Sequence, residues 1–170
     1  MIDIEKDSLV TEVPISREPH NIVVDKHKNV WVLCQGGYDG VMNPSLYCID
    51  HSTKKIENIF NFNAGTDYPM SLAIDPAGET LYYINGGFGT LDVYRMSIES
   101  EALPREAFVK AEGRNFYNVS VSPDNEVFVT DAKSYMENGD VLRYSDSGEL
   151  LETYEAGIIP GFMLFNTEAR

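Results

Sequence analysis

Histidine and cysteine, two residue types that often carry catalysis or hold metals, are scarce in this sequence. The histidines are His20, His27 and His51, and the cysteines are Cys34 and Cys48. The sequence contains no Gly-x-Ser-x-Gly nucleophile motif, no Cys-x-x-Cys pair and no glycine-rich phosphate loop. We therefore predict no catalytic residue, no resident metal and no cofactor.

Aromatic, amide and charged side chains instead gather in the stretches between short apolar segments. Such groups can stack on a flat or glycan-like ligand and hydrogen-bond to it, and loops on a rigid scaffold commonly carry binding sites. The alternative is that each side chain packs only within its own loop. The candidate ligand-binding residues are Glu18, His20, Tyr38, Asp39, Tyr68, Phe88, Arg114, Asn115, Phe116 and Tyr135.

The segments that must position these loops follow a repeated sequence pattern. Each copy is a short apolar strand, a polar turn and a second apolar strand, which is the pattern of a β-hairpin. Aligning Ile22, Leu72 and Val119 spaces the copies by 50 and 47 residues, a period typical of β-propeller blades. The copies cover residues 21–34, 71–85 and 118–131.

The repeats predict an all-β fold, a β-propeller built of four-stranded antiparallel blades that is present as an incomplete arc. Two outer strands, three full blades and one inner strand make fifteen expected strands, and no convincing helix is predicted. The expected units are residues 1–17 (outer strands of a blade), 18–62, 63–111 and 112–156 (full blades), and 157–170 (inner strand of a further blade).

Large aromatic residues recur at one position of the repeat, at Trp31, Tyr82 and Phe128. A ligand-stacking residue has no reason to recur with the blades, so these rings are predicted to pack between blades.

Acidic residues recur in the turns, at Asp25, Asp75, Asp124 and Asp146. Aspartate favours tight reversals because its carboxylate accepts hydrogen bonds from nearby backbone N–H groups. We interpret these residues as turn initiators in preference to metal ligands.

The two cysteines are predicted to be buried free thiols. In the expected hairpin register Cys34 lies opposite Ser45 and Cys48 lies opposite Trp31, which staggers the two sulfurs beyond easy disulfide reach.

Composition restricts the partners. The formal net charge of −14 opposes binding to phosphate backbones, so nucleic acid is not expected. No apolar run approaches the roughly 18 residues of a membrane-spanning helix, and the first residues carry no signal pattern.

The second strands, Leu81-Tyr-Tyr-Ile-Asn85 and Val127-Phe-Val-Thr-Asp131, resemble the Tyr-Val-Thr-Asn repeats of YncE-like, surface-layer-type propellers. Three further segments are similar to Bacteroidetes cell-surface propeller lipoproteins of this kind: 30–37, 46–50 and 159–162. The resemblance implies a non-enzymatic protein of the cell envelope, surface-exposed or periplasmic, that binds a small molecule, glycan or protein. For some relatives the implied ligand is a corrinoid.

A second resemblance points to an enzyme. Residues 121–131 and 139–148 are similar to repeats of the lactonase and NHL propellers. Those lactonases set Glu, Asn and Asp around a central metal, which here would implicate Glu18, Asn118 and Asp131. This alternative implies a metal-dependent hydrolase.

The strand count predicts open ends. Members of the resembled family usually close a ring of about seven blades, and fewer than four blades cannot close one. The apolar faces at both ends of an open arc are prone to association. We therefore expect either self-association, most simply as a two-fold dimer, or missing upstream blades, with this chain as the C-terminal part of a longer propeller.

Overall fold

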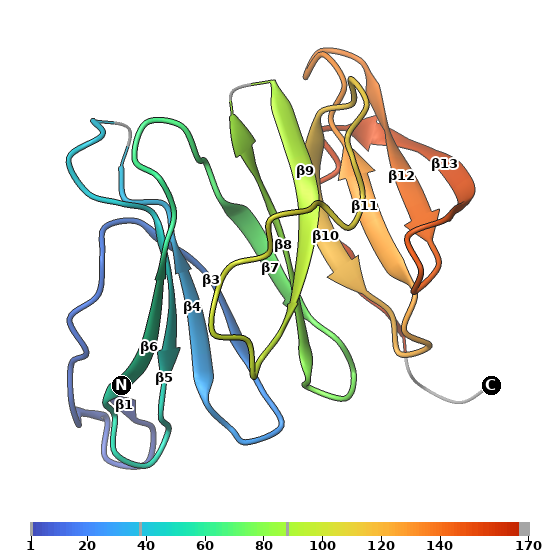
Figure 1. Cartoon of the computed structure of the whole chain (residues 1–170). Coiled ribbons are helices and arrows are strands. Elements are labelled where there is room, and N and C mark those ends of the chain that lie inside the picture. Colours follow the sequence, from blue (N-terminus) through green and yellow to red (C-terminus); the bar gives the residue numbers. More distant parts are fainter. Residues whose placement is uncertain (1, 38, 88, 167–170) are drawn as a thin grey trace.

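The computed structural model describes residues 2–37, 39–87 and 89–166, and in these residues every regular element is a β-strand. Three main antiparallel sheets, each a blade, stand side by side in chain order, and the strand axes of the three sheets are roughly aligned (Figure 1). The predicted fold class, an all-β propeller arc built of antiparallel blades, is confirmed.

The first blade contains β3 (Pro19–Val24), β4 (Val30–Cys34), β5 (Ser45–Ile49) and β6 (Ile56–Asn61) in that order. Strands β4 and β5 are covered on both faces. This two-sided burial is what packing between neighbouring sheets requires.

The third blade also has four strands in chain order. They are β10 (Phe116–Val121), β11 (Val127–Asp131), β12 (Asn138–Tyr144) and β13 (Leu150–Ile158). The last strand is nine residues long and mostly exposed.

The second blade has three strands, β7 (Met70–Ile74), β8 (Thr80–Gly87) and β9 (Thr90–Ser97), where four were predicted. In place of a fourth, outer strand, the chain makes one isolated bridge to β9, between Val93 and Val109. Phe108 and Val109 both donate their backbone N–H groups to the Val93 carbonyl. The segment therefore crosses the edge of β9 instead of running along it.

The N-terminal segment forms a smaller element than the expected outer half-blade. Its strands β1 (Ile2–Asp3) and β2 (Ser8–Leu9) have two residues each and pair only with each other. Further on, Val13 and Ile15 pack against the first blade on the face turned away from the second. The backbone N–H of Ser16 donates to the Tyr47 hydroxyl at 3.1 Å, which attaches the segment that contains Val13 and Ile15 to the first blade.

The expected inner strand at 159–165 is not formed, and this prediction was wrong. Residues 159–166 have no strand assignment, because a strand needs a neighbour to pair with and Pro160 lacks a backbone donor. Its Phe165 ring packs on the third blade, with its centroid 5.3 Å from that of Phe128, while Phe162 and Leu164 are 94% and 97% exposed.

The core lies between the blades, as the recurring aromatic position predicted. Trp31 is 1% exposed and stacks on Phe60 in the cluster that joins the first and second blades. Tyr82 holds the equivalent place between the second and third blades. Phe128 is half-buried and packs against the tail residue Phe165 on the third blade.

The turn chemistry is confirmed in two blades and corrected in the third. Asp25 accepts hydrogen bonds from the N–H groups of His27 and Asn29, and Asp75 does the same for residues 79 and 80. In the third blade the hydroxyl oxygens of Ser122 and Ser145 take this role instead of Asp124 and Asp146. A serine oxygen accepts the same backbone bonds at the same turn position.

The cysteines behave as predicted. Cys34 pairs across the sheet with Ser45, and Cys48 pairs with Trp31. Both thiols are free and buried, on opposite faces of the first blade. Burial raises the pKa of Cys34 to about 11 and that of Cys48 to about 12, so both stay protonated at neutral pH.

No helix in the part of the chain that the structure describes is long and apolar enough to cross a membrane.

Candidate functional site

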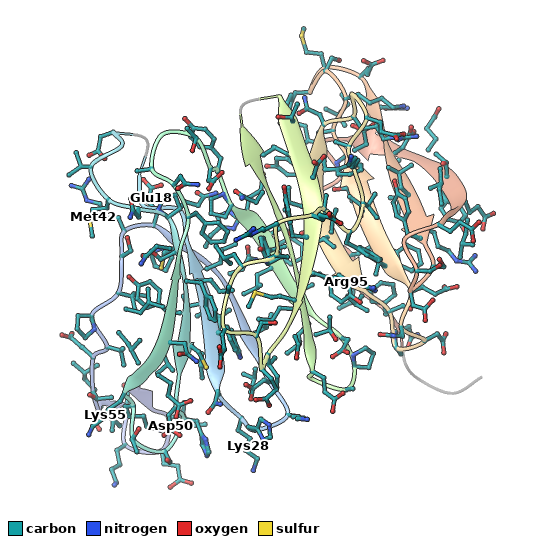
Figure 2. All side chains as sticks on the ribbon, in the orientation of Figure 1. Glu18, Lys28, Met42, Asp50, Lys55 and Arg95 are labelled. Atoms are coloured by element: carbon teal, nitrogen blue, oxygen red, sulfur yellow. The ribbon has the colours of Figure 1, made fainter. Side chains whose placement is uncertain are left out.

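All three blades contribute to one hollow. It lies on the side of the sheets where the inner strands β3, β7 and β10 begin. Its volume is about 410 Å³, within the range of roughly 300–1,000 Å³ typical of small-molecule sites. Figure 2 shows Glu18 at this end of the first blade, with Lys28, Asp50 and Lys55 at the opposite end. We call this hollow the axial pocket; its lining residues are Glu18, His20, Gln35, Gly37, Tyr68, Met70, Gly89, Leu91, Asn115, Tyr117 and Tyr135.

Six of these residues occupy two equivalent positions of the repeat. Two residues before the aligned Ile22, Leu72 and Val119, the three blades carry His20, Met70 and Tyr117. Four residues before the same points they carry Glu18, Tyr68 and Asn115. The scaffold therefore repeats while the chemistry at the pocket differs from blade to blade.

A β-bulge near the start of each inner strand helps to position these side chains. The register shifts between Pro19 and Asn21 in β3, between Met70 and Leu72 in β7, and between Phe116 and Asn118 in β10. A bulge inserts one unpaired residue and redirects the side chains beside it. The same irregularity in all three blades places the pocket residues together, on the side where the inner strands begin.

Backbone hydrogen bonds fix the segment before each inner strand to the end of the second strand. The Gln35 N–H donates to the Glu18 carbonyl at 3.0 Å, and the Tyr68 N–H donates to the Gly86 carbonyl at 3.1 Å. In the third blade the Ala132 N–H donates to the Asn115 carbonyl at 2.9 Å. The pocket wall is therefore held by the main chain of every blade.

In the third blade, side chains reinforce this attachment. The buried Asp131 carboxylate accepts the N–H groups of Asn115 and Lys133 through one oxygen. The Asn115 amide in turn donates to the Lys133 carbonyl at 2.9 Å. Asp131 therefore supports the wall of the pocket without lining it.

Two cationic side chains near the pocket, Arg17 and Lys133, are paired with carboxylates. The Arg17 guanidinium contacts the Asp39 carboxylate at 2.6 Å, and the Lys133 ammonium contacts Asp140 at 2.8 Å. The Val41 N–H and then Arg17 lower the pKa of Asp39, while the hydrogen bond to Asp140 raises the pKa of Lys133. Both pairs favour the charged forms and leave these cations little free charge to offer a ligand.

Half of the candidate binding residues come together at the axial pocket: Glu18, His20, Tyr68, Asn115 and Tyr135. Tyr38 and Phe88 lie outside the described residues.

The other three candidates do not line the pocket. Asp39 pairs with Arg17 on the surface, and Arg114 is half-buried in its own loop. Phe116 is 0% exposed in the core between the second and third blades, so its assignment as a ligand contact was wrong. As the first residue of β10 it packs inward with that strand.

Sequence reasoning missed six lining residues: Gln35, Gly37, Met70, Gly89, Leu91 and Tyr117. A signal was present for two of them, because Met70 and Tyr117 stand at the repeat position of His20.

The metal set that the lactonase resemblance implied is not gathered at the axial pocket. Only Glu18 lines it, while the Asn118 amide oxygen accepts a hydrogen bond from the Ser71 hydroxyl at 3.0 Å. Asp131 is buried and hydrogen-bonded to backbone. Within 2–37, 39–87 and 89–166, no group of three or more His, Cys, Asp or Glu residues could hold a metal ion.

A second hollow has a volume of about 360 Å³ and contains the turn residues Asp75, Asn125 and Asp146. Arg95 also lines this hollow; it donates to the Asp146 carbonyl at 2.6 Å and lies over the Phe108 ring. These contacts join the second and third blades and account for the arginine structurally.

No protein-family model matches the chain, and no curated protein matches it. Solved structures do match. A calcium-binding protein, regucalcin, from Agrobacterium tumefaciens aligns with 81% of this chain and 45% of its own at 15% identity and a TM-score of 0.57. A quinonprotein alcohol dehydrogenase-like protein from Bacteroides thetaiotaomicron aligns with 81% and 33% at 19% identity and a TM-score of 0.59.

The β-propeller domain of the Trilobed protease from Pyrococcus furiosus, which has an open velcro topology, aligns with 85% of this chain and 45% of its own. Its identity is 10% and its TM-score is 0.57. These likenesses show the β-propeller fold. The chain spans less than half the length of each of these three structures.

Proposed function

We propose that this chain belongs to a non-enzymatic β-propeller that binds a small organic molecule or glycan at the axial pocket. The observation that carries the proposal is the convergence of all three blades on one hollow with varied side chains. A rigid repeated scaffold with differing residues at its rim is the usual arrangement of a propeller ligand site.

The chemistry of the lining supports this class of ligand. Tyr68, Tyr117 and Tyr135 offer ring faces and hydroxyl groups, and Asn115 and Gln35 offer amides. The Tyr117 and Tyr135 rings are nearly perpendicular, at 80°, with centroids 6.1 Å apart. Rings and amides together suit a ligand with a flat or sugar-like face and polar edges.

The resemblance of the repeats to YncE-like surface propellers supports the cellular setting. We place the protein in the cell envelope, surface-exposed or periplasmic, among propellers similar to those of Bacteroidetes. A corrinoid is one ligand that this resemblance suggests, and a protein ligand at the same loop face is another.

Calorimetric titration with a corrinoid and a set of oligosaccharides tests the proposal. We expect one class to bind, and Tyr117→Ala to weaken binding by roughly tenfold, which corresponds to about 1.4 kcal/mol for a lost aromatic contact. The matched control is Tyr154→Ala, which removes an exposed tyrosine of β13 outside the pocket lining. Binding unchanged in Tyr117→Ala, or lactone hydrolysis dependent on bound calcium or zinc, would overturn the proposal.

We also propose that another blade packs on the outer face of the first blade, either from a second copy or from upstream blades. Ile22, Val24 and Ile59 are 64%, 53% and 49% exposed. Ile22 and Ile59 lie in one cross-strand row with Val32 and Tyr47, so the exposed apolar groups share a face. Solvent-exposed apolar surface of this kind commonly marks an interface.

For the second-copy form of this proposal, sedimentation velocity should show a dimer that Ile22→Asp converts to monomer. The substitution replaces a surface residue, so far-UV circular dichroism should stay unchanged. Val41→Asp, at a residue 76% exposed in a loop, should remain dimeric. A folded wild-type chain that is monomeric at every concentration would rule out the second copy.

A further inference from the structure

Glu18 is the one charged carboxylate among the described residues that line the axial pocket. Its carbonyl accepts the Gln35 N–H, which attaches its main chain to the residue after β4. Its φ of 54° lies in the left-handed region. Its carboxylate makes no hydrogen bond or ion pair with any described residue. Among the described lining residues the other ionisable side chain besides the tyrosines is His20, whose Nδ1 lies 2.6 Å from the Asn21 amide oxygen and not on Glu18.

Neither Arg17 nor Lys133 forms an ion pair with the Glu18 carboxylate. The neighbouring cations Arg17 and Lys133 contact Asp39 and Asp140 at 2.6 and 2.8 Å. The net charge of the chain is −14, which adds a negative background potential. Such a field attracts cationic ligands and repels anionic ones.

Aromatic and apolar side chains line part of the pocket, beside the polar side chains of His20, Gln35 and Asn115. Tyr68, Tyr117 and Tyr135 line the pocket together with Met70 and Leu91. The face of a tyrosine ring attracts a cation, and several rings around an ammonium group form the cage that recognises choline-like and methylated ammonium ligands. Apolar side chains suit the methyl groups of such a ligand because they require no hydrogen bonds.

We propose that the axial pocket binds a small organic cation of the methylated or quaternary ammonium class, with Glu18 as its counter-charge and the three tyrosines against its methyl groups. This inference rests on the proposed function of the pocket and specifies the charge of its ligand.

Two probes of nearly equal shape separate charge from size. Choline carries a quaternary ammonium group, and 3,3-dimethylbutan-1-ol has a neutral carbon in its place. Titration of each into the chain, followed by amide chemical shifts, should show choline binding at least tenfold more tightly than the neutral alcohol. Glu18→Gln should remove most of this difference and leave binding of the alcohol unchanged.

Glu57→Gln is the matched control, because it removes the same charge from an exposed position on β6 that does not line the pocket. It should bind choline as the wild type does. Equal affinity for the two probes, or equal weakening by both variants, would overturn the cation inference.

The result also distinguishes this inference from the proposed function. Binding of a neutral oligosaccharide at the pocket with no choline binding would overturn the cation inference alone. Absence of shifts at the pocket with choline, the alcohol, the corrinoid and the oligosaccharides would overturn both.

Discussion

Trp31→Ala should lower the free energy of unfolding by about 3–5 kcal/mol, the range found for truncating a large buried aromatic residue. The side chain is 1% exposed, stacks on Phe60 with ring centroids 6.0 Å apart, and fills the junction of the first two blades. Its indole N–H also donates to the Asp25 carboxylate at 2.9 Å. Truncation therefore leaves both a cavity and an unpaired buried carboxylate oxygen.

Urea denaturation followed by far-UV circular dichroism measures this change. Tryptophan fluorescence is not a suitable probe, because the variant lacks the only tryptophan of the chain. His51→Ala, at an exposed turn residue, should change the free energy of unfolding by about 0.5 kcal/mol or less. Trp31→Phe should fall between these two, since it keeps a ring in the cavity but loses the bond to Asp25. Equal small effects of all three substitutions would contradict the assigned core.

Gly86→Ala should have the second largest effect, a loss of about 2–3 kcal/mol from backbone strain and steric conflict together. Gly86 has a φ of 148°, and a Cβ atom there would lie 1.9 Å from the Thr90 carbonyl oxygen. The end of the β8–β9 hairpin must move to accommodate it. Because the Gly86 carbonyl accepts the Tyr68 N–H, this movement also displaces a wall of the axial pocket.

The matched control is Gly157→Ala, because a Cβ at Gly157 would meet no atom within 4 Å. It should change the free energy of unfolding by about 0.5 kcal/mol or less. Binding of any pocket ligand should weaken in Gly86→Ala and stay the same in Gly157→Ala. A Gly86→Ala protein as stable as the wild type would show that the hairpin end does not constrain the blade.

Most of the arc could be predicted from the sequence because each strand pair is local. The hairpins around Asp25 and Asp75 are predicted by apolar runs and turn residues that lie within a dozen positions of each other. The failures fall where a strand depends on something outside its own segment. The run near Val109 only crosses the β9 edge, and residues 159–165 have no neighbour to pair with.

The site could be predicted by position more readily than by residue type. Glu18, Tyr68 and Asn115 were found because they stand in variable segments before the inner strands. Phe116 was misassigned because the sequence around an aromatic residue at the edge of a loop does not indicate whether the ring faces a ligand or the core. Its burial is set by the packing of β10 against the second blade, which a single sequence does not reveal.

We propose that the ligand site lies where the inner strands of the three blades begin. Amide chemical-shift mapping with a library of small fragments tests it most directly, because every hollow of the chain is surveyed in one experiment. We predict that shifts concentrate at residues 18–21, 68–71 and 115–118, in all three blades together. Shifts centred instead on Asp75, Arg95 and Asp146 at the second hollow, or on one blade alone, would contradict the account.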